Sequence, residues 1–426
     1  MFKRNKDHNK MEIKRKKTII CPYCMGEIKP DEILFMTDGG TGKDDVFQKF
    51  ADKFLYSDCH ESGEGHMGQI IDQKDNSIEI EYNEDTKFPM AVVMERNGGE
   101  RRRYTKRICH HCHCYLVDGI EYTDIKNIVV LGGTSCGKTT FLSALLHEAI
   151  GDDTGAMLSG LLGRAKIEGD SKPYLDKYIK NWKNGERDAT LTGRNLFPIV
   201  FSVENINRTN RVIITIHDFA GEGMRDSDYF ANHPIATREI DGVFLMIDAC
   251  QLSNYQKYKI ENACAIKITK CIEFTNAAIK KLRKVNSIAV VLNKFDIIME
   301  KANKTDNPTV AYEPTLSGHH KEAVSTNAIK GVSQTVREII RKDGGEFEAG
   351  ALIPTIESLF DKKWQPNEEL NDLEYFAVST MGLTKHEKGE GHEEYYSCEY
   401  HEDRALHRVL EPLLYFLARW RIFESK

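Results

Sequence analysis

The 426-residue sequence contains no run of about 18 consecutive apolar residues, so we expect no membrane-spanning segment. Residues 1–20 lack the apolar core of a signal peptide. They are rich in lysine and arginine, and we interpret them as a basic, solvated tail, with a patch for phosphates or a membrane surface as the alternative. A net charge of -6 gives no general basic excess, which argues against nucleic-acid binding over the whole surface.

The sequence also lacks the even, regular cysteine spacing of a disulfide framework. Of its 11 cysteines, six precede Leu116, and four of these form two C-x-x-C pairs. That spacing is typical of metal sites in a reducing compartment, so we expect a cytoplasmic protein. The length allows two or three domains, and 40% hydrophobic with 29% charged residues is ordinary for a globular chain.

The stretch "IVVLGGTSCGKTTFLSALL" joins a β-branched apolar run, through a glycine loop, to apolar residues at helical spacing. The loop fits G-x-x-x-x-G-K-T. We expect its N–H groups to hold phosphates at the start of the helix, Lys138 to neutralise phosphate charge, and the Thr139 hydroxyl to ligate Mg²⁺. The nucleotide-binding residues predicted here are Gly132, Gly133, Thr134, Ser135, Cys136, Gly137, Lys138, Thr139 and Thr140.

A second apolar run, "RVIITIHDFAGEG", ends in residues suited to the metal and the terminal phosphate. Asp218 stands at the end of the predicted strand, where a carboxylate beside the phosphate loop can hold Mg²⁺ directly or through water. Gly221 can offer its N–H to the γ-phosphate because no Cβ blocks the approach.

Two later runs end in residues suited to the base. "SIAVVLNKFD" ends in Asn293, Lys294 and Asp296, and the Asp296 carboxylate can accept from the two N–H donors of guanine. Adenine presents no such pair, so the sequence predicts GTP and GDP as ligands. "LEYFAVSTMG" ends in Ser379 and Thr380, where a backbone N–H can meet guanine O6.

Taken in this order, the phosphate loop, the DxxG and NKxD sequences and the late Ser-Thr strand end resemble the Ras-like GTPases of the translation-factor-related (TRAFAC) class. The resemblance covers the chain from about Lys126 onward. It implies an α/β fold, with a mostly parallel six-stranded sheet, helices on both faces and the nucleotide at the carboxyl ends of the strands. The turn "NRTN" is expected to join an antiparallel edge hairpin, and 404–423 to form a closing helix that Pro412 either kinks or begins.

The resemblance also implies catalytic roles, and here the sequence departs from the family. The threonine that senses the γ-phosphate and completes the Mg²⁺ ligands beside Thr139 and Asp218 is expected at Thr192, with Thr190 as the alternative. Glu222 follows Gly221 where Ras-like enzymes carry a glutamine that orients the attacking water. A carboxylate accepts from water but cannot donate to the phosphoryl oxygens, so we expect slow hydrolysis. The predicted catalytic residues are Lys138, Thr192, Gly221 and Glu222.

The two C-x-x-C pairs predict a Zn²⁺ site of four thiolates at Cys21, Cys24, Cys109 and Cys112. Residues 21–122 would then form a small zinc-ribbon-like module in which 35–105 is an insertion. The sequence is also compatible with three alternatives: a site that includes His113 or Cys114, a site that includes the Cys-His pair at 59–60, and no metal at all. A closed four-thiolate site is structural, because no coordination position remains for a catalytic water.

The complete order resembles bacterial double-GTPase or GTPase-associated-system proteins, on the stretches "CPYC", "CHHCH", "GGTSCGKTT", "DFAGE" and "NKFD". That resemblance implies a role in biological-conflict operons with dedicated protein partners. We expect a GTPase domain over 123–426, with insertions at 151–195 and 299–371. A GTP-bound scaffold without turnover is the alternative function. The third is a nucleic-acid-directed GTPase that uses the zinc module and the basic "RRRYTKR".

Two other segments carry weaker expectations. The stretch 253–284 is expected to form a long helix or a helix pair, from the spacing of its apolar residues. The acidic, histidine-rich segment 385–403 is interpreted as a solvated loop and a candidate partner surface.

Overall fold

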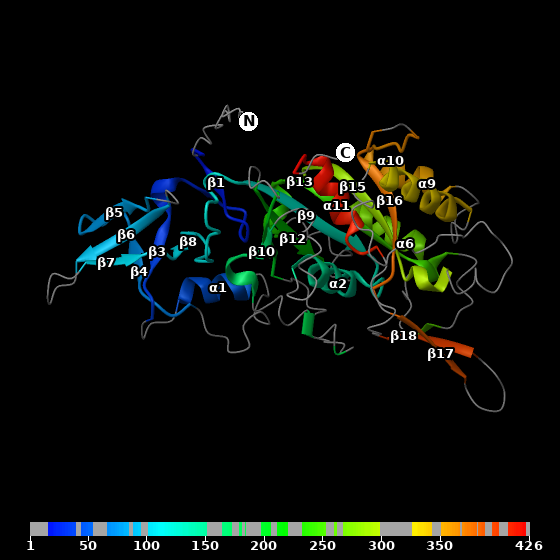
Figure 1. The fold of residues 1–426 in the computed structure, drawn as a ribbon, viewed down its shortest axis with the longest axis horizontal. Helices are drawn as coiled ribbons and strands as arrows, with labels where there is room; N and C mark the ends of the chain where they lie inside the picture. Colours follow the sequence, from blue (N-terminus) through cyan, green and yellow to red (C-terminus); the bar gives the residue numbers. More distant parts are fainter. Residues whose placement is uncertain are drawn as a thin grey trace, which may run out of the picture.

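The computed structural model describes residues 16–39, 44–53, 66–84, 88–94, 101–150, 164–172, 179–180, 184, 197–205, 211–219, 232–252, 260–261, 267–298, 326–342, 351–366, 369–380, 382–387, 394–399 and 408–422. Small sheets built from the amino-terminal residues lie beside a larger α/β part (Figure 1). The larger part carries the predicted nucleotide-binding sequences.

A seven-stranded sheet forms the centre of the larger part, in the order β10-β11-β12-β9-β13-β15-β16. The strands β12, β9, β13, β15 and β16 run parallel, and β10 and β11 extend the sheet in antiparallel pairing. The strand bounds are β9 (Asp124–Gly132), β10 (Arg164–Ile167), β11 (Ile199–Glu204), β12 (Arg211–Asp218), β13 (Glu239–Asp248), β15 (Lys284–Asn293) and β16 (Leu373–Val378).

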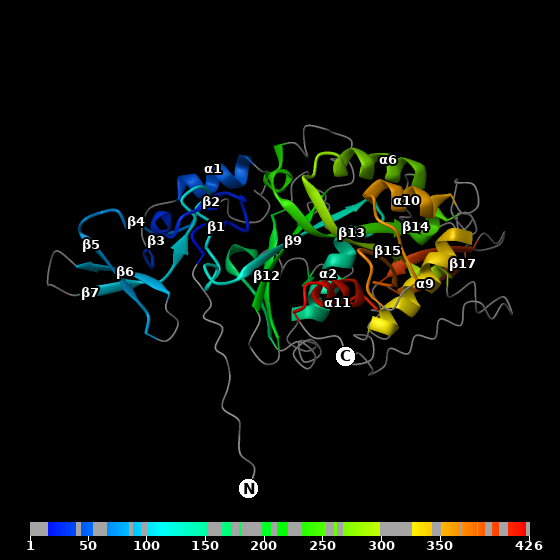
Figure 2. The same ribbon diagram turned by 90° about the horizontal axis from the view of Figure 1, so that it is seen from above.

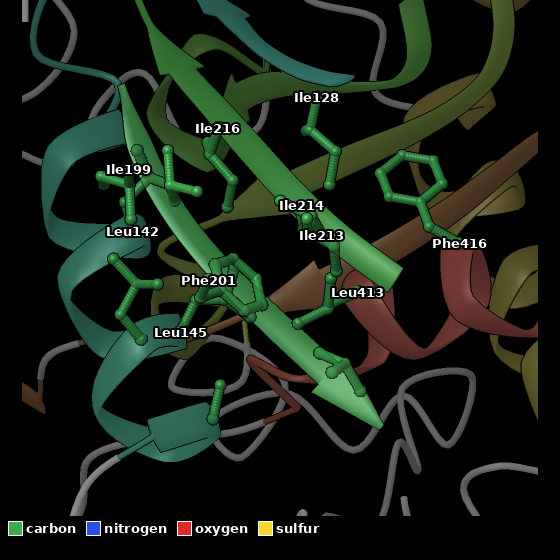
Figure 3. Packing of buried hydrophobic residues seen from close by; sticks show 14 of the residues in the cluster. Ile128, Leu142, Leu145, Ile199, Phe201, Ile213, Ile214, Ile216, Leu413 and Phe416 are labelled. Carbon is green, nitrogen blue, oxygen red and sulfur yellow. The ribbon is translucent and has the colours of Figure 1, made fainter. Parts of the chain in front are cut away.

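Helices cover both faces of this sheet (Figure 2). One face carries α2 (Lys138–Ile150) and α11 (Glu411–Arg419); the other carries α6 (Ile268–Ile279), α9 (Thr326–Lys342) and α10 (Leu352–Phe360). The central strands are rich in valine, isoleucine and leucine because parallel strands are buried on both faces. Figure 3 shows the hydrophobic core on the face covered by α2 and α11, where Leu142 of α2 and Phe416 of α11 pack with strand residues such as Ile214.

The expected mostly parallel sheet with helices on both faces is confirmed, with one strand more than the six predicted. The additional strand is β10, which pairs from Ile167 beside Phe201 to Arg164 beside Glu204. It lies inside the stretch 151–195 that the sequence assigned to an insertion. Four residues with two charged side chains give too weak an alternation to predict a strand, and β10 forms because β11 offers an open edge.

The last helix begins where its proline allows. Pro412 lies in the first turn of α11, where its missing N–H leaves no helix bond unmade, so the proline marks the start of the helix. In 253–284, where a long helix or a helix pair is expected, the described residues form α6 over Ile268–Ile279 and a two-residue strand β14 at Ile260–Glu261.

The segment interpreted as a solvated loop at 385–403 instead contributes to a hairpin, and this is a correction. β17 (Gly382–Glu387) and β18 (Glu394–Glu399) pair antiparallel, and β14 pairs with β18 to complete a three-stranded sheet. The tyrosines of "EEYYSCE" favour a strand, and the acidic composition concealed that signal. The hairpin lies at the lower right of Figure 1.

The amino-terminal part consists of short strands around the cysteine pairs. β1 pairs with β2, a second sheet has the order β4-β3-β8, and a third has the order β5-β6-β7. The bounds are β1 (Ile19–Ile20), β2 (Glu27–Ile28), β3 (Leu34–Met36), α1 (Asp45–Lys53), β4 (Ile70–Asp72), β5 (Ile78–Tyr82), β6 (Pro89–Met94), β7 (Arg101–Tyr104) and β8 (Arg107–Ile108). Most of these elements belong to the stretch 35–105, which therefore has its own folded structure.

Of the stretch predicted as a basic tail, residues 16–20 are described; Ile19 is buried, whereas Lys17 and Thr18 are exposed. The Lys16 ammonium donates to the Thr123 carbonyl at 2.7 Å and pairs with Asp124 at 2.9 Å, and 19–20 form β1. Within the described ranges, no helix combines the length and the apolar character needed to cross a bilayer.

Candidate functional site

Register places the polar strand ends along one edge of the large sheet. In the parallel pairs, Met246 lies beside Gly132, Asp248 beside Asn293, and Asn293 beside Val378. Asp218 is the last residue of β12 and pairs with Val130 of β9. Side chains from four strands therefore gather where the phosphate loop leaves β9, as expected for open α/β sheets.

The phosphate loop turns from β9 into α2 through three residues with positive φ. Gly132 has φ 153°, Ser135 has φ 63° and Gly137 has φ 85°. A Cβ at Gly132 would lie 2.8 Å from both the Cys136 sulfur and the Met246 carbonyl, and one at Gly137 would collide with the Asn293 amide. Both glycines are therefore required by close packing as well as by backbone conformation.

Lys138 is buried in the loop, with its ammonium 3.0 Å from the carbonyl oxygens of Gly132 and Gly133. This ammonium stands inside the ring of loop backbone, where it can meet an anion that approaches the N–H groups. Gly133, Thr134, Cys136 and Thr140 lie in the same loop and first helical turn.

Thr139 and Asp218 face each other across the start of α2. The Thr139 hydroxyl donates to Oδ2 of Asp218 at 3.1 Å, while Oδ1 of Asp218 is buried without a hydrogen-bond partner among the described residues. Burial raises the pKa of Asp218 to about 6, against the opposing effects of Lys138 and the Thr139 bond. A hydroxyl next to a buried carboxylate with one unused oxygen is the oxygen-ligand set that Mg²⁺ prefers.

Asn293 and Lys294 tie the end of β15 to the phosphate loop. The Asn293 side chain donates to the Cys136 carbonyl at 3.0 Å, and the Lys294 ammonium lies 3.4 Å from the Ser135 carbonyl. The same ammonium pairs with Asp248 at 2.6 Å. Lys294 has a left-handed backbone, with φ 59°, so the strand ends sharply at this residue.

Asp296 and Ser379 form a second linked pair. The Ser379 hydroxyl donates to Oδ1 of Asp296 at 2.8 Å and accepts from the Asp296 N–H at the same distance. Oδ2 of Asp296 has no hydrogen-bond partner among the described residues. Burial raises the pKa of Asp296 to about 6, although Ser379 and Lys294 lower it. Thr380 follows Ser379 and is also buried.

Several predicted residues lie outside the described part of the chain. They are Thr192 and its alternative Thr190, Gly221 and Glu222. Their assignments stay predictions from the sequence.

The four cysteines predicted to bind zinc form a second cluster. The sulfur atoms of Cys21, Cys24, Cys109 and Cys112 all lie within 4.8 Å of one another. Two sulfur pairs, Cys21 with Cys112 and Cys24 with Cys109, are 3.7 Å apart. A tetrahedral Zn²⁺ with bonds of about 2.3 Å separates its sulfurs by about 3.8 Å, so the spacing fits such an ion.

The two C-x-x-C turns, at 21–24 and 109–112, are called the first and second knuckle, and they share one local geometry. In the first, the Met25 N–H donates to the Cys21 carbonyl at 3.0 Å, and in the second the His113 N–H donates to the Cys109 carbonyl at 2.8 Å. Met25 and His113 both have left-handed backbones, with φ 56° and 57°. In each knuckle, the turn therefore directs both sulfur atoms toward the sulfur atoms of the other knuckle.

The alternative ligands point elsewhere or are not described. Nδ1 of His113 lies 2.8 Å from the Asp44 carboxylate, and the Cys114 thiol donates to the Cys112 carbonyl at 3.9 Å. Residues 59–60 fall outside the described ranges. Burial raises the pKa of the Cys21 and Cys112 thiols well above their usual value, so these two sulfurs need a cation close by in order to be thiolates.

Comparison with known proteins adds little to this geometry. No protein-family model matches the chain, and no curated protein matches it. Among solved structures, the chain is similar to Sup35 complexed with GDP, at 14% identity and TM-score 0.25, over 60% of this chain and 37% of that one. The chain therefore spans well under half the length of that protein.

Two further solved structures are similar. The S. cerevisiae Ski7 GTPase-like domain bound to GTP has 17% identity and TM-score 0.27, over 60% of this chain and 43% of that one. The septin GTPase domain from Chlamydomonas reinhardtii has 10% identity and TM-score 0.26, over 71% of this chain and 95% of that one. At such TM-scores these likenesses carry no weight for function, which must be inferred from the site itself.

Asp248 is the site residue that the sequence prediction missed. It is fully buried, pairs with Lys294 and accepts from the Cys250 N–H at 2.8 Å. The signal was present in "GVFLMIDA", because an aspartate ends a buried strand there just as Asp218 does. Its role is to hold Lys294 against the loop.

We expect Asp248→Ala to lower the free energy of unfolding by about 3 kcal/mol, because it leaves the Lys294 ammonium without its carboxylate. The double variant Asp248→Ala/Lys294→Ala should recover part of that loss. Urea unfolding of the three variants and the wild type measures the cycle. Strictly additive losses would show that the two charges do not interact.

Proposed function

We propose that the chain binds GTP and GDP and hydrolyses GTP slowly as a molecular switch. The observation that carries the proposal is the pair of unused buried carboxylate oxygens on either side of the phosphate loop, Oδ1 of Asp218 and Oδ2 of Asp296. A buried carboxylate oxygen without a partner is costly, and a ligand that supplies a cation at one and N–H donors at the other relieves both.

The two oxygens call for different chemistry. Asp218 lies 3.1 Å from the Thr139 hydroxyl, so these two residues would hold Mg²⁺, which neutralises phosphate charge when bound. Asp296 stands at the other end of the loop, next to Lys294. Its free oxygen suits the N1–H and exocyclic amine of guanine, whereas adenine has no such pair of donors. A guanine nucleotide lying along the strand ends therefore satisfies both carboxylates.

Slow hydrolysis rests on the sequence. Glu222 and Thr192 are assigned to the attacking water and the γ-phosphate, with Gly221 as an N–H donor and Lys138 as the cation on the phosphates. A carboxylate at position 222 accepts from water and repels the charge that develops on the phosphoryl oxygens. Turnover then depends on a protein partner, in keeping with the resemblance to GTPases of bacterial conflict systems.

The four-cysteine cluster serves in this proposal as a structural Zn²⁺ site, because its sulfur spacing fits and no fifth protein ligand is grouped with it among the described residues. Nucleic-acid binding through "RRRYTKR" is less favoured. Arg101 of β7 pairs with Glu79 and Glu81 of β5 across the intervening strand β6, Arg103 pairs with Glu81, and Lys106 pairs with Asp38.

The test of base recognition is Asp296→Asn. An amide reverses one acceptor into a donor, so GDP affinity should fall by about 10- to 100-fold, and xanthosine diphosphate, whose 2-oxo group needs a donor, should be preferred. Titration calorimetry with both nucleotides and ADP measures the change. The control is Asp372→Asn, at a partly exposed carboxylate that pairs with Lys362 and Arg419 away from the site, and it should keep the wild-type preference. Unchanged GDP selectivity in Asp296→Asn would overturn the guanine assignment.

GDP binding should also depend on pH. The nucleotide binds the charged form of Asp296, whose pKa burial raises to about 6. Affinity is then constant above about pH 7 and falls, by up to tenfold per unit, as pH drops below about 6. The Asp218→Asn variant, titrated in EDTA, lacks the other carboxyl group with a raised pKa. Its GDP affinity should fall with pH in the same way. Affinity that stays flat to pH 5 contradicts the prediction.

Zinc binding is tested by a matched pair of cysteine variants. Cys112→Ser should lose about one zinc per chain and loosen the amino-terminal module, because structural zinc contributes folding energy. Cys114→Ser replaces a neighbouring buried thiol that is outside the four-sulfur cluster and should keep the metal. Elemental analysis of purified protein decides. Loss of zinc from Cys114→Ser would indicate instead the alternative zinc site that includes Cys114.

Turnover distinguishes the switch from the scaffold alternative. We expect a single-turnover GTP hydrolysis rate in the range of unassisted GTPases, about 10⁻⁴ to 10⁻² per second. Glu222→Gln should hold or raise that rate, whereas Glu222→Ala should lower it because no group then holds the water. Equal rates for all three proteins would remove Glu222 from the mechanism, and no hydrolysis at all would favour the scaffold.

A further inference from the structure

The first cysteine knuckle, "CPYC" at 21–24, is in direct contact with the nucleotide-binding part. Its Tyr23 side chain is fully buried, and Met25 immediately after it packs in the core of the larger part. These contacts involve residues next to two segments to which roles at the γ-phosphate are assigned: the segment that contains Thr192 and the segment that contains Gly221 and Glu222.

Tyr23 connects the knuckle to the chain that leaves β10. Its hydroxyl donates to the Glu168 carbonyl at 3.2 Å and accepts from the Asp170 N–H at 2.9 Å. Gly169, between them, has φ 55°, and a Cβ there would lie 2.5 Å from the Tyr23 oxygen. The backbone of 168–170 is thus shaped around this one hydroxyl.

Tyr23 also contacts the other border of the same segment. Its ring lies 5.0 Å from the ring of Phe197, which precedes β11. Ser171 holds the two borders together, since its hydroxyl donates to the Pro198 carbonyl and accepts from the Val200 N–H. The residues between these borders include Thr192. β11 begins at Ile199 beside Ile216, two residues before Asp218, so this anchor lies close to the expected metal ligand.

Arg238 forms the second connection. Its Nε and Nη2 atoms donate to the Met25 carbonyl at 3.1 and 2.6 Å, and Nη1 pairs with Glu27 at 3.1 Å. Arg238 follows the short helix Pro234–Thr237, where the chain that passes through Gly221 and Glu222 returns to the sheet at β13. One knuckle therefore holds a border of each segment.

We propose that the four-cysteine site and the nucleotide site are energetically linked through Tyr23 and Arg238, which act as positioning residues. The proposal rests on the function proposed above. With zinc bound, the knuckle keeps its shape and fixes these two borders. When zinc or an anchor is lost, the backbone next to the metal and phosphate ligands opens more often, and Mg-GDP dissociates faster. Linkage is reciprocal in binding free energy, so a bound nucleotide must raise the affinity for zinc, and we expect this gain as a slower release of zinc.

Matched variants test the link. Tyr23→Phe should raise the Mg-GDP dissociation rate at least about fivefold, the lower limit of typical coupling, while zinc content stays at one per chain. Tyr415→Phe is the control, because Tyr415 is equally buried and its hydroxyl likewise donates to a backbone carbonyl, that of Asn371 at 2.7 Å. It should change the rate less than twofold.

The second anchor has its own pair. Arg238→Gln should act like Tyr23→Phe, whereas Arg419→Gln, which also removes bonds to a carbonyl and a carboxylate, should leave the rate unchanged. In zinc-stripped protein, Tyr23→Phe should add nothing further, because the knuckle no longer holds the anchor. A Tyr23→Phe rate equal to wild type, or a full effect that persists without zinc, overturns the link.

The rate of zinc release supplies a readout that does not depend on measuring Mg-GDP dissociation. A chromophoric chelator should draw zinc at least about fivefold more slowly from the Mg-GDP-bound chain than from the nucleotide-free chain. If the wild type binds no guanine nucleotide, the proposed function fails. The link is then judged by hydrogen exchange in nucleotide-free protein, where Tyr23→Phe must accelerate exchange at the amides of Val200 and Asp218. Equal exchange would reject it as well.

Discussion

The alignment of parallel strands is the constraint on which the site depends. β12, β9, β13, β15 and β16 are buried on both faces, so most of their polar residues stand at or near the ends of the strands. Because the strands are parallel and in register, those ends meet at one edge. Asp218, Asp248 and Asn293 are brought together by backbone hydrogen bonds rather than by attraction between their side chains. The site is therefore a consequence of the hydrophobic core, and two of its carboxyl groups stay partly unsatisfied because the core fixes where they stand.

Much of this could be predicted from the sequence, because the strands are strongly apolar and each ends in a distinctive polar group. The two knuckles could be predicted too, since C-x-x-C spacing sets sulfur direction locally. Other features depend on the tertiary structure alone. β10 forms on an edge that β11 provides, and its four residues carry no signal of their own. Asp248 stands at a strand end like Asp218, but only the fold reveals that its partner is Lys294. The hairpin of β17 and β18 was concealed by acidic composition.

The contacts of Tyr23 belong to the same group of unpredictable features. Nothing in "CPYC" indicates that the tyrosine contacts residues about 145 positions away, at Glu168 and Asp170. The sequence separates a cysteine module from a nucleotide-binding part, whereas the structure shares one hydrophobic core between them, with Cys21 and Tyr23 in the same cluster as Phe197 and Leu142. The division of the chain into a metal module and a GTPase domain is thus a division of sequence features. The shared core means that each part contributes to the stability of the other.

The knuckles have a consequence for how the chain folds. They stand on either side of about 84 residues that contain two small sheets and a helix. Closing a loop of that length costs only slightly more conformational entropy than closing a much shorter one, because the cost grows with the logarithm of length. The closed ring of chain can therefore accept insertions or deletions within it at little cost, while the pair of turns that closes it cannot change. During synthesis, the first knuckle must wait for the second, which precedes the phosphate loop in the chain.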